Sequence, residues 1–482
     1  MLKTVAAVTL LSSIAAFSST EVHAEASIKE KCDYDGKIGE NPDYKTAICL
    51  LTEAAIEDDV PPEIVIEIAK KESKLEQFDE DGEPVISPDG GIGIMQLTNQ
   101  PAFDQEKLKN DILYNIEAGI NTLNDKFERT DLPAINNKDR HVIEHWYFAV
   151  MAYNGTKPIN SPVKQATGET NEGAYQEEIF SSIRAGVGYD ELARMDFKAE
   201  DFEYDTESDK SIEFMKDQYH FLIPFTKSKH FYNQDQTIGS IVDLRVRKAP
   251  STKAEIVGTL NEGDLATVTG PYQYDQSPNL NSFVFYPVKL ENGTEGYVAS
   301  PYLRNKFKDV PKDNYSVESI EYLYDMNILK GYSEDEFGYK DPLKRKNTAL
   351  FLVRAENIDL TNRPDPGFVD VPKSSDFYDE VAALADEGIF EGDNKNRFNL
   401  DSYLKRREMA VLLQRVYQFP SASIEEPFTD VKDNDWYKEA VERLYASGIT
   451  NGVSETEFGP DQRITREQFA TFLARSINKN FR

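Results

Sequence analysis

Glu72 is the residue of this chain that best fits the chemistry of a general acid. Val65, Ala69 and Glu72 recur at positions i, i+4 and i+7 of an apolar segment, so a helix would place this carboxyl on its inward-packing stripe. Burial disfavours the charged form of a carboxyl and raises its pKa, as protonation of a leaving oxygen near neutral pH requires. For Glu72 taken alone, a solvated carboxylate at a helix end is the competing interpretation.

Two later segments would complete a site around this acid. Residues 88–97 contain three glycines within four positions, which lets the backbone pass close to a ligand or to the helix of Glu72, and Gln96 then offers an amide. The glycines have neither the Lys-Ser/Thr pair nor the strand-helix context of a phosphate loop. Further on, Ala152-Tyr-Asn-Gly155 adds an aromatic ring and an amide. These groups together suggest a site for cleaving a glycosidic bond.

Helices are the elements expected to position these groups. Asp59 precedes Pro61-Pro62, which predicts a helix start with a capping side chain and with proline in the first turn. A second amphipathic helix is predicted from an apolar face made of Ile112, Ile116, Ile120, Leu123 and Phe127. A third helix is predicted from about His141 to Asn154-Gly155. The first domain should therefore be mainly α.

In order along the chain, Glu72-Ser73, Gly91-Ile-Gly-Ile-Met-Gln96 and Ala152-Tyr-Asn-Gly155 resemble the Glu-Ser, Gly-Leu-Met-Gln and Ala-Tyr-Asn-x-Gly motifs of the soluble-lytic-transglycosylase family. The resemblance covers roughly residues 45–185. It implies a lysozyme-like α fold that cleaves the MurNAc-GlcNAc β-1,4 bond of peptidoglycan and leaves a 1,6-anhydro end. It also implies that Glu72 acts as the acid and then as the base that helps the sugar's own 6-hydroxyl attack. The implied glycan-binding residues are Ser73, Gly91, Met95, Gln96, Tyr153 and Asn154.

An acidic insertion, residues 78–86, makes the gap between Glu72 and the glycine loop longer than is usual in that family. A hydrolase would use a second carboxylate, about 5 Å away in retaining enzymes and about 6.5 to 9.5 Å away in inverting enzymes. Asp79, Asp81 and Asp89 are the candidates, so a muramidase-type hydrolase stays open beside the single-acid transglycosylase. A surface-layer or wall-binding protein with an inactive catalytic domain is an alternative of a different class.

The C-terminal third of the chain repeats a unit of about sixty residues. Each copy opens with Phe-x-Asp-Val and carries, in one register, a glycine at +24, a phenylalanine at +30 and arginines at +38 and +47. Each copy should form two helices, the first ending at Asn327, Gly388 or Gly448, which are residue types that accept a left-handed cap. The predicted copies span residues 307–360, 366–420 and 426–482.

These repeats resemble the surface-layer homology (SLH) domain, whose signature is Phe-x-Asp-Val, Gly-Ile-x-x-Gly and Thr-Arg-Ala-Glu. The resemblance implies a pseudo-threefold α-helical body whose grooves bind a secondary cell-wall polymer, commonly pyruvylated, because a guanidinium fork suits a carboxylate. Arg345, Arg406 and Arg466 hold the arginine position, and Trp436 fits the aromatic one. Lys344-Arg-Lys-Asn347 departs most from the signature, so the first groove is the most doubtful. Arginines that only join the repeats are the alternative.

Between these helical regions, residues 238–304 contain short β-type runs separated by turn signals such as Asn261-Glu-Gly263, which predict a small antiparallel β barrel. Leu244-Arg-Val-Arg247 and Gly296-Tyr-Val298 resemble a bacterial Src-homology-3-like domain, for which binding of wall peptides and a spacer role are both open. Residues 196–237 are acidic and aromatic, and either link this domain to the transglycosylase-like domain, 25–195, or extend the latter.

The N-terminus indicates export. Residues 1–24 combine an early lysine, an apolar stretch and the small-residue exit Val22-His23-Ala24, which predicts a signal peptide. In the oxidising compartment that follows, Cys32 and Cys49 are expected to form a disulfide, with two free thiols as the alternative. No later apolar run is long enough to predict a membrane span.

The pattern as a whole predicts a multidomain, secreted protein retained at the bacterial cell wall or S-layer. Its expected partners are peptidoglycan and the secondary cell-wall polymer, and its chemistry calls for no cofactor and no metal. The net charge of −31 argues against nucleic acid as a partner. Because wall polymers are also largely anionic, local arginine and lysine clusters would have to supply the attraction to the wall.

Overall fold

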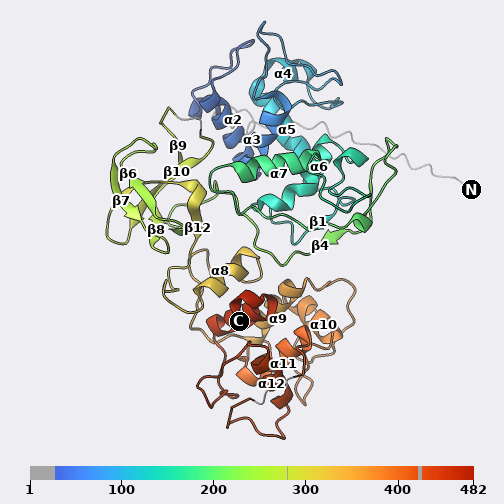
Figure 1. Ribbon diagram of the computed structural model, residues 1–482, viewed down its shortest axis with the longest axis vertical. Helices are drawn as coiled ribbons and strands as arrows, with labels where there is room; N and C mark the ends of the chain where they lie inside the picture. The colour runs from blue at the N-terminus through green and yellow to red at the C-terminus, as the bar shows by residue number, and fades with distance from the viewer. Residues whose placement is uncertain (1–27, 279–280, 422–425) are drawn as a thin grey trace, which may run out of the picture. The chain divides into compact units, whose positions relative to one another are not determined.

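The computed structural model describes residues 28–278, 281–421 and 426–482 (Figure 1). It divides into two compact units, with the boundary after Asp125. The predicted signal peptide, residues 1–24, lies outside the described residues. No helix in the described part of the chain is long and apolar enough to cross a membrane.

The first unit is built from helices. Their bounds are α2 (Tyr44–Glu57), α3 (Pro62–Ser73), α4 (Gln105–Asn110) and α5 (Ile112–Phe127), the last of which crosses the unit boundary by two residues. The five apolar residues predicted for the face of α5 are all buried. The predicted capping role of Asp59 was wrong: Pro61 is the N-cap of α3 and no side chain caps it. Asp59 instead adopts a left-handed φ of 56° in the turn between α2 and α3.

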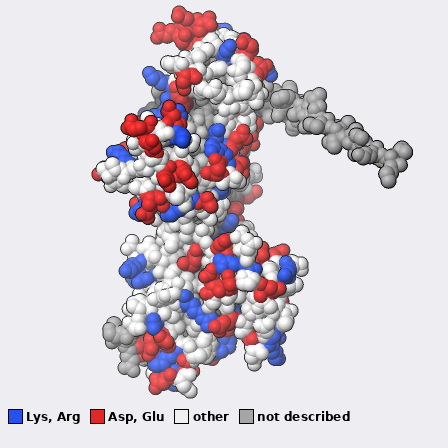
Figure 2. All heavy atoms as spheres, turned by 90° about the vertical axis from the view of Figure 1, so that its right-hand side faces the viewer, with Lys and Arg blue, Asp and Glu red and all other residues white. Residues whose placement is uncertain are grey.

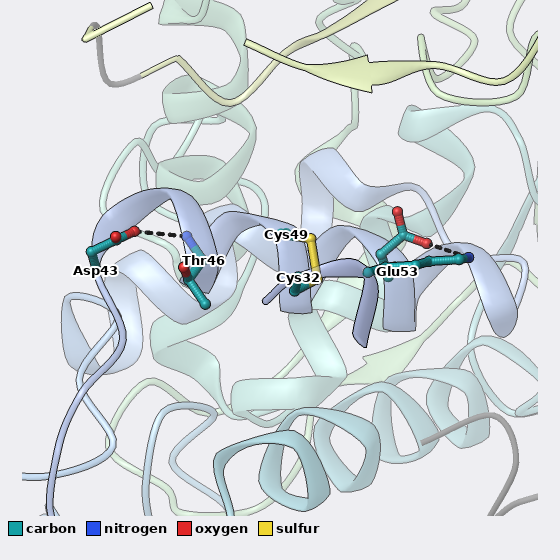
Figure 3. The surroundings of a disulfide bond; sticks show 6 residues. Cys32, Asp43, Thr46, Cys49 and Glu53 are labelled. Carbon is teal, nitrogen blue, oxygen red and sulfur yellow. Dashed lines mark hydrogen bonds and ion pairs between the residues drawn. A yellow bond between two sulfur atoms is a disulfide. The ribbon is translucent and has the colours of Figure 1, made fainter. Parts of the chain in front are cut away.

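A disulfide fastens the start of the described chain to α2 (Figure 3). Cys32 directly follows the helical residues 28–31 and bonds to Cys49 in α2, with their Cα atoms 5.6 Å apart. Near this bond, Lys31 forms an ion pair of 2.9 Å with Glu53. At the start of α2, Asp43 accepts a hydrogen bond from the backbone N–H of Thr46, which caps the helix. The disulfide and the ion pair together hold the N-terminal segment on α2.

The second unit begins with a helical region. The predicted helix from about His141 to Asn154 starts as the 3-10 helix η1 (Ile143–Trp146) and continues as α6 (Tyr147–Asn154). The remaining helices of this region are η2 (Pro158–Asn160) and α7 (Tyr175–Ala185). Trp146 and Tyr147 are among the largest fully buried side chains, so the junction of η1 and α6 lies in the core.

Residues 196–237 pack onto this helical region. Their short elements are η3 (Ala199–Asp201), β2 (Phe202–Glu203), β3 (Glu213–Phe214) and β4 (Gln218–Tyr219), and β4 pairs in parallel with β1 (Ala134–Ile135). Phe197, Phe214 and Tyr219 each place an aromatic ring against Phe148 of α6. Backbone pairing and aromatic packing therefore both join this segment to the helices before it.

The β-rich region forms one antiparallel sheet, in the order β12-β5-β8-β10-β11-β6-β7, with β9 paired to β10. The strands are β5 (Thr237–Ser240), β6 (Leu244–Arg247), β7 (Ile256–Leu260), β8 (Leu265–Val268), β9 (Gln273–Tyr274), β10 (Val284–Leu290), β11 (Glu295–Ala299) and β12 (Leu303–Asn305), with η4 (Ser300–Tyr302) before the last. Among the described residues this path does not close on itself, so the predicted barrel is not confirmed.

The C-terminal region contains three two-helix copies (Figure 1). Their helices are α8 (Val317–Asp325) and α9 (Arg345–Glu356), α10 (Tyr378–Asp386) and α11 (Arg406–Tyr417), and α12 (Lys438–Ala446) and α13 (Arg466–Ile477), with η5 (Lys479–Phe481) at the end. Just beyond the first helix of each copy, Asn327, Gly388 and Gly448 have φ values of 57°, 67° and 72°. The predicted left-handed caps are therefore confirmed.

Backbone hydrogen bonds join the three copies in a ring. The N–H of Leu343 donates to the carbonyl of Ile464 at 2.8 Å, Ile464 donates to Leu404 at 2.9 Å, and Leu404 donates to Leu343 at 2.8 Å. One hydrophobic core extends through all three copies. The carboxylate of each Phe-x-Asp-Val motif accepts hydrogen bonds from backbone N–H groups at the +30 phenylalanine and the residue after it, namely Asp309 from Phe337 and Gly338, Asp370 from Phe398 and Asn399, and Asp430 from Phe458 and Gly459.

Candidate functional site

Glu72 lies in the last turn of α3 and is half-buried. Val65, Ile68 and Ala69, which share its helix face, are completely buried. The helix ends at Lys74, whose φ of 59° is left-handed, so the chain turns away directly after Ser73. The carboxyl group therefore stands at the end of an inward-packing stripe, as the sequence periodicity predicts.

Ser73 fastens the end of α3 to the glycine loop. Its hydroxyl lies 2.9 Å from the carbonyl oxygen of Ile94 and accepts a hydrogen bond from the backbone N–H of Glu76. Because Ile94 belongs to the run from Gly91 to Gln96, this contact holds that run beside the residue that follows Glu72. Ser73 is only 9% exposed, and these contacts are with protein backbone.

The glycines of the loop are packed closely against the protein itself. Gly93 has a φ of 70°, and a β-carbon at this position would lie 2.4 Å from Oε1 of Gln77 and 2.5 Å from Nδ2 of Asn115. A β-carbon at Gly91 would lie 2.8 Å from Oγ of Ser87 and 2.9 Å from Oε1 of Gln96. Gly93 therefore needs glycine for both its positive φ and its two buried neighbours, whereas a side chain at Gly91 would displace the ends of the Ser87 and Gln96 side chains.

Two fully buried amides, Gln77 and Asn115, hold the loop in place. The N–H of Ile94 donates to Oε1 of Gln77 at 2.9 Å, and the N–H of Met95 donates to Oδ1 of Asn115 at 3.0 Å. The amide nitrogens of these two side chains donate in turn to the carbonyls of Ile92, Leu108 and Lys109. Sequence reasoning missed both residues. For Asn115 a signal was present, because an amide three residues after Ile112 lies on the apolar face of its helix.

Met95 and Gln96 have different environments. Met95 is completely buried and packs so closely on α5 that a β-carbon at Gly119 would lie 2.7 Å from its side chain. Gln96 is half-buried, has a left-handed φ of 48°, and donates from Nε2 to the carbonyl of Gly93 at 2.7 Å. Of the two, only Gln96 presents part of its side chain to solvent.

The three candidate second acids, Asp79, Asp81 and Asp89, are all exposed. Oδ1 of Asp79 accepts hydrogen bonds from the N–H groups of Asp81 and Glu83, which closes the turn of the acidic insertion. A hydrogen bond from Ser87 lowers the pKa of Asp89. In the described ranges, no group of three or more His, Cys, Asp and Glu side chains is placed to hold a metal ion.

Tyr153 and Asn154 end α6 in the second unit, where Tyr153 is half-buried and Asn154 is exposed. Gly155 follows Asn154 directly with a φ of 120°, so the intervening residue of the family motif is missing. Asn160, which the sequence analysis also missed, donates from Nδ2 to Oδ1 of Asn154 at 3.0 Å and to the carbonyl of Gly155 at 2.8 Å. The buried side chain of Asn160 therefore fixes the position of the exposed Asn154 amide.

The three repeat arginines bond to the neighbouring copy in the same way. Nε of Arg345, Arg406 and Arg466 donates to the carbonyl of the +30 phenylalanine in the next copy, which is Phe398, Phe458 and Phe337 in turn. Burial lowers the pKa of Arg406 to about 10. Trp436, by contrast, is 64% exposed. The arginines therefore join neighbouring copies of the repeat.

Three family models match separate parts of the chain. The transglycosylase SLT domain matches residues 50–177, which include α3, the glycine loop and α6. The bacterial SH3 domain matches residues 242–304. The S-layer homology domain matches three times, over residues 306–346, 367–410 and 427–470.

Curated relatives share only part of their length with this chain. The surface-layer 125 kDa protein of Lysinibacillus sphaericus is 28% identical over 184 residues, which are 37% of this chain and 15% of that protein. The amylopullulanase of Thermoanaerobacterium thermosulfurigenes is 29% identical over 43% of this chain and 12% of its own. The S-layer protein sap of Bacillus anthracis is 28% identical over 35% of this chain and 21% of its own. The chain thus carries a transglycosylase SLT domain, a bacterial SH3 domain and three S-layer homology domains.

Proposed function

We propose that this protein is a peptidoglycan lytic transglycosylase anchored to the cell wall, with Glu72 as its acid and base. The observation that carries this proposal is the bond between Ser73 and Ile94, which holds the loop bearing Gln96 next to the end of α3. The match of the transglycosylase SLT domain to this region supports the same reaction class. The substrate would be the MurNAc-GlcNAc β-1,4 bond.

The reaction needs one carboxyl group that changes its protonation state. Protonated Glu72 gives its proton to the glycosidic oxygen as the bond from that oxygen to C1 of MurNAc breaks. The 6-hydroxyl of the same sugar then attacks C1 and gives its proton to the Glu72 carboxylate, which forms the 1,6-anhydro ring and restores the acid. No water is consumed. Gln96, Tyr153 and Asn154 would position the glycan, because each presents a polar group that is not fully buried.

A muramidase-type hydrolase is the second candidate. It would need Asp79, Asp81 or Asp89 to activate water or to attack C1, and all three residues are exposed, the first two in the acidic insertion and Asp89 just before the glycines. Exposed loop acids are usually solvated, which favours the single-acid reaction. The surface-layer relatives favour a further alternative, a wall-binding protein without catalysis.

Anchoring would come from the three repeats, which we propose bind a secondary, pyruvylated cell-wall polymer. Acidic and basic side chains are interspersed on the face shown in Figure 2, so the general surface offers little attraction to an anionic wall. The proposed binding groups are Arg345, Arg406, Arg466 and Trp436. The resulting protein would be exported and would work at the wall or S-layer.

The test is the release of muropeptides from purified sacculi by the full chain and by Glu72→Gln. We expect the substitution to lower the rate by at least about a hundredfold, because it removes the only proton carrier of the reaction. Glu76→Gln, at an exposed position just beyond the end of α3, is the matched control and should keep the wild-type rate. Mass spectrometry should find 1,6-anhydro ends. Reducing ends would identify a hydrolase, and equal release by wild type and Glu72→Gln would exclude catalysis by Glu72.

A further inference from the structure

Asn41 lies in the segment before α2 and holds the start of the acidic insertion. Its Oδ1 accepts hydrogen bonds from the backbone N–H groups of Gln77 at 2.8 Å and Phe78 at 3.0 Å, and its Nδ2 donates to the carbonyl of Phe78 at 2.6 Å. Asn41 itself is exposed, whereas Gln77 and Phe78 are almost completely buried. One side chain at the surface therefore fixes two backbone positions of the interior by three hydrogen bonds.

A second contact joins the same segment to the turn of the insertion, where two glycines meet. A β-carbon at Gly39 would lie 3.2 Å from the carbonyl oxygen of Gly82, and a β-carbon at Gly82 would lie 3.1 Å from the carbonyl oxygen of Gly39. Both glycines have a φ of 80°. The segment that contains Asn41 therefore packs on the insertion at its start and at its turn.

The insertion pairs in turn with the glycine loop. The N–H of Val85 donates to the carbonyl of Gln77 at 2.9 Å, and the N–H of Gly93 donates to the carbonyl of Val85 at 2.8 Å. Gln77 also contacts the loop directly, because its Oε1 accepts from the N–H of Ile94. Asn41 is therefore one residue away from the loop, since it holds the backbone of Gln77 and the side chain of Gln77 holds Ile94.

A disulfide and an ion pair hold the segment that carries Asn41 (Figure 3). Residues 33–43 form neither helix nor strand, and they lie between the bonded Cys32 and Cys49. Irregular backbone has no regular hydrogen bonding to fix it, and a cross-link restricts the conformations open to the chain that it encloses. The position of Asn41 therefore depends on the disulfide at the two ends of this stretch.

We infer that Asn41 is a positioning residue for the reaction proposed at Glu72, and that the disulfide-closed segment 32–49 supports it. Through Gln77, Asn41 fixes the loop that carries Gln96. The transglycosylase SLT match begins beyond this segment, so the support is an addition to the region that the match describes. The inference rests on the proposed function, and it assigns to Asn41 an effect on the orientation of the glycan rather than on its binding.

A displaced loop should affect the rate more than the affinity. Proton transfer from Glu72 requires the glycosidic oxygen within hydrogen-bond reach, and a misplacement of about 1 Å can lower a rate by as much as about a hundredfold. Binding of an extended glycan depends on contacts along its whole length, so it is less sensitive to the position of one loop. A change at Asn41 should therefore lower kcat and leave KM nearly unchanged.

The test measures kcat and KM of the full chain on soluble glycan strands prepared from peptidoglycan. Asn41→Ala removes all three hydrogen bonds to the insertion. Asn41→Asp is the conservative variant, because it keeps an oxygen that accepts from Gln77 and Phe78. Asp43→Ala is the matched control, because it removes a hydrogen bond to the backbone of Thr46 in the same segment and leaves the bonds of Asn41 in place.

We expect Asn41→Ala to lower kcat about tenfold with KM nearly unchanged, and Asn41→Asp to recover most of the rate. Asp43→Ala should keep the wild-type kcat, although it lowers Tm. Hydrogen exchange at the amide of Ile94 should be faster in Asn41→Ala and unchanged in Asp43→Ala. The inference is overturned by a wild-type kcat or unchanged exchange in Asn41→Ala, by an equal loss of kcat in Asp43→Ala, or by no recovery in Asn41→Asp.

The double variant Cys32→Ala, Cys49→Ala tests the support. It should lower kcat severalfold, and adding Asn41→Ala should cause little further loss, because both changes release the same contact. Losses that multiply would overturn the role of the disulfide-closed segment. Asn41 is exposed, so its substitution decides the inference even if the cysteine variant folds poorly.

Glu72→Gln, assayed beside these variants, separates this inference from the proposed function. Equal rates of muropeptide release by wild type and Glu72→Gln would refute the proposed function. A large loss in Glu72→Gln together with a wild-type kcat in Asn41→Ala would refute the positioning role alone.

Discussion

We predict that Gly93→Ala strongly lowers stability. The positive φ of Gly93 is unfavourable for alanine, and the neighbouring side chains leave no room for a β-carbon. The left-handed conformation costs about 1 to 2 kcal/mol for alanine, and a displaced buried amide at Gln77 or Asn115 costs about 1 to 3 kcal/mol more. Gly90→Ala is the matched control, because Gly90 also has a positive φ, 87°, but has nothing within 4 Å of its β-carbon position. Thermal unfolding and muropeptide release should show a clearly larger loss for Gly93→Ala. Similar losses in both variants would contradict the role of the buried amides.

Glu144 should make the second unit less stable as the pH rises. Its carboxylate is completely buried and accepts hydrogen bonds from the N–H groups of Ala193 and Thr226. Burial raises its pKa from 4.5 to about 7, so the folded state binds the proton more tightly than the unfolded state. Its contribution is therefore complete below about pH 4.5 and is lost as the pH rises to about 7, which amounts to about 3 kcal/mol.

This pH dependence can be measured by unfolding in denaturant at several pH values, followed by the fluorescence of the buried Trp146 in a Trp436→Phe background. Glu144→Gln is the comparison, because an amide does not titrate. We expect the variant to be less stable overall, since its NH₂ group cannot accept a hydrogen bond, but to lack this fall in stability between pH 4.5 and 7. An unchanged slope in the variant would assign the pH dependence to other groups.

Periodicity predicted which residues share a face but not what each of them touches. The helix face on which Glu72 lies was predictable, because apolar residues that recur every 3.6 positions identify the face that packs on the core. The contacts of Ser73 and Gly93 were not, because their partners lie 21 and 22 residues away, at Ile94 and Asn115. A glycine in a motif indicates that another group packs closely against the backbone. Only the fold shows that, at Gly93, this group is a side-chain amide of the same protein.

At the scale of elements, Arg466 closes the ring of repeats by joining α13 to the first copy, and we predict that the ring depends on it. Its guanidinium donates to the carbonyls of Phe337 and Lys330 while almost completely buried. Arg466→Ala would remove the donor to the carbonyl of the buried Phe337, at a cost of about 1 to 3 kcal/mol. Arg345→Ala should cost less stability, because water can reach its partly exposed site.

The two arginine variants can be compared by hydrogen exchange of the backbone amides in α13 and α9. We expect Arg466→Ala to speed exchange in both helices, since the ring would open as a unit, and Arg345→Ala to have a smaller effect. The opposite order would mean that the exposed joint carries more of the stability than the buried one.

The helices of the repeats were predictable because the same pattern recurs in three copies in one register. The sheet occurs once, so no second copy supported the prediction of its strand pairing. The left-handed caps at Asn327, Gly388 and Gly448 follow from residue type and position. Whether the sheet closes depends on whether its two end strands, β12 and β7, pair with each other. Such pairing between distant segments produces no periodic pattern in the sequence. The 3-10 start of α6 was missed for a similar reason, since Trp146 is held by the carbonyl of Arg140 and by burial rather than by local propensity.

At the scale of the whole molecule, the net charge of −31 should slow its approach to an anionic wall. This repulsion acts over the Debye length, which falls from about 30 Å at 0.01 M salt to about 8 Å at 0.15 M. The proposed contacts of the repeat arginines act at short range and are screened less. We therefore expect attachment of the Glu72→Gln chain to intact sacculi to become several times faster over this salt range, as measured by a sedimentation time course. Attachment that slows as salt is added would mean that local arginine and lysine clusters already steer the protein to the wall.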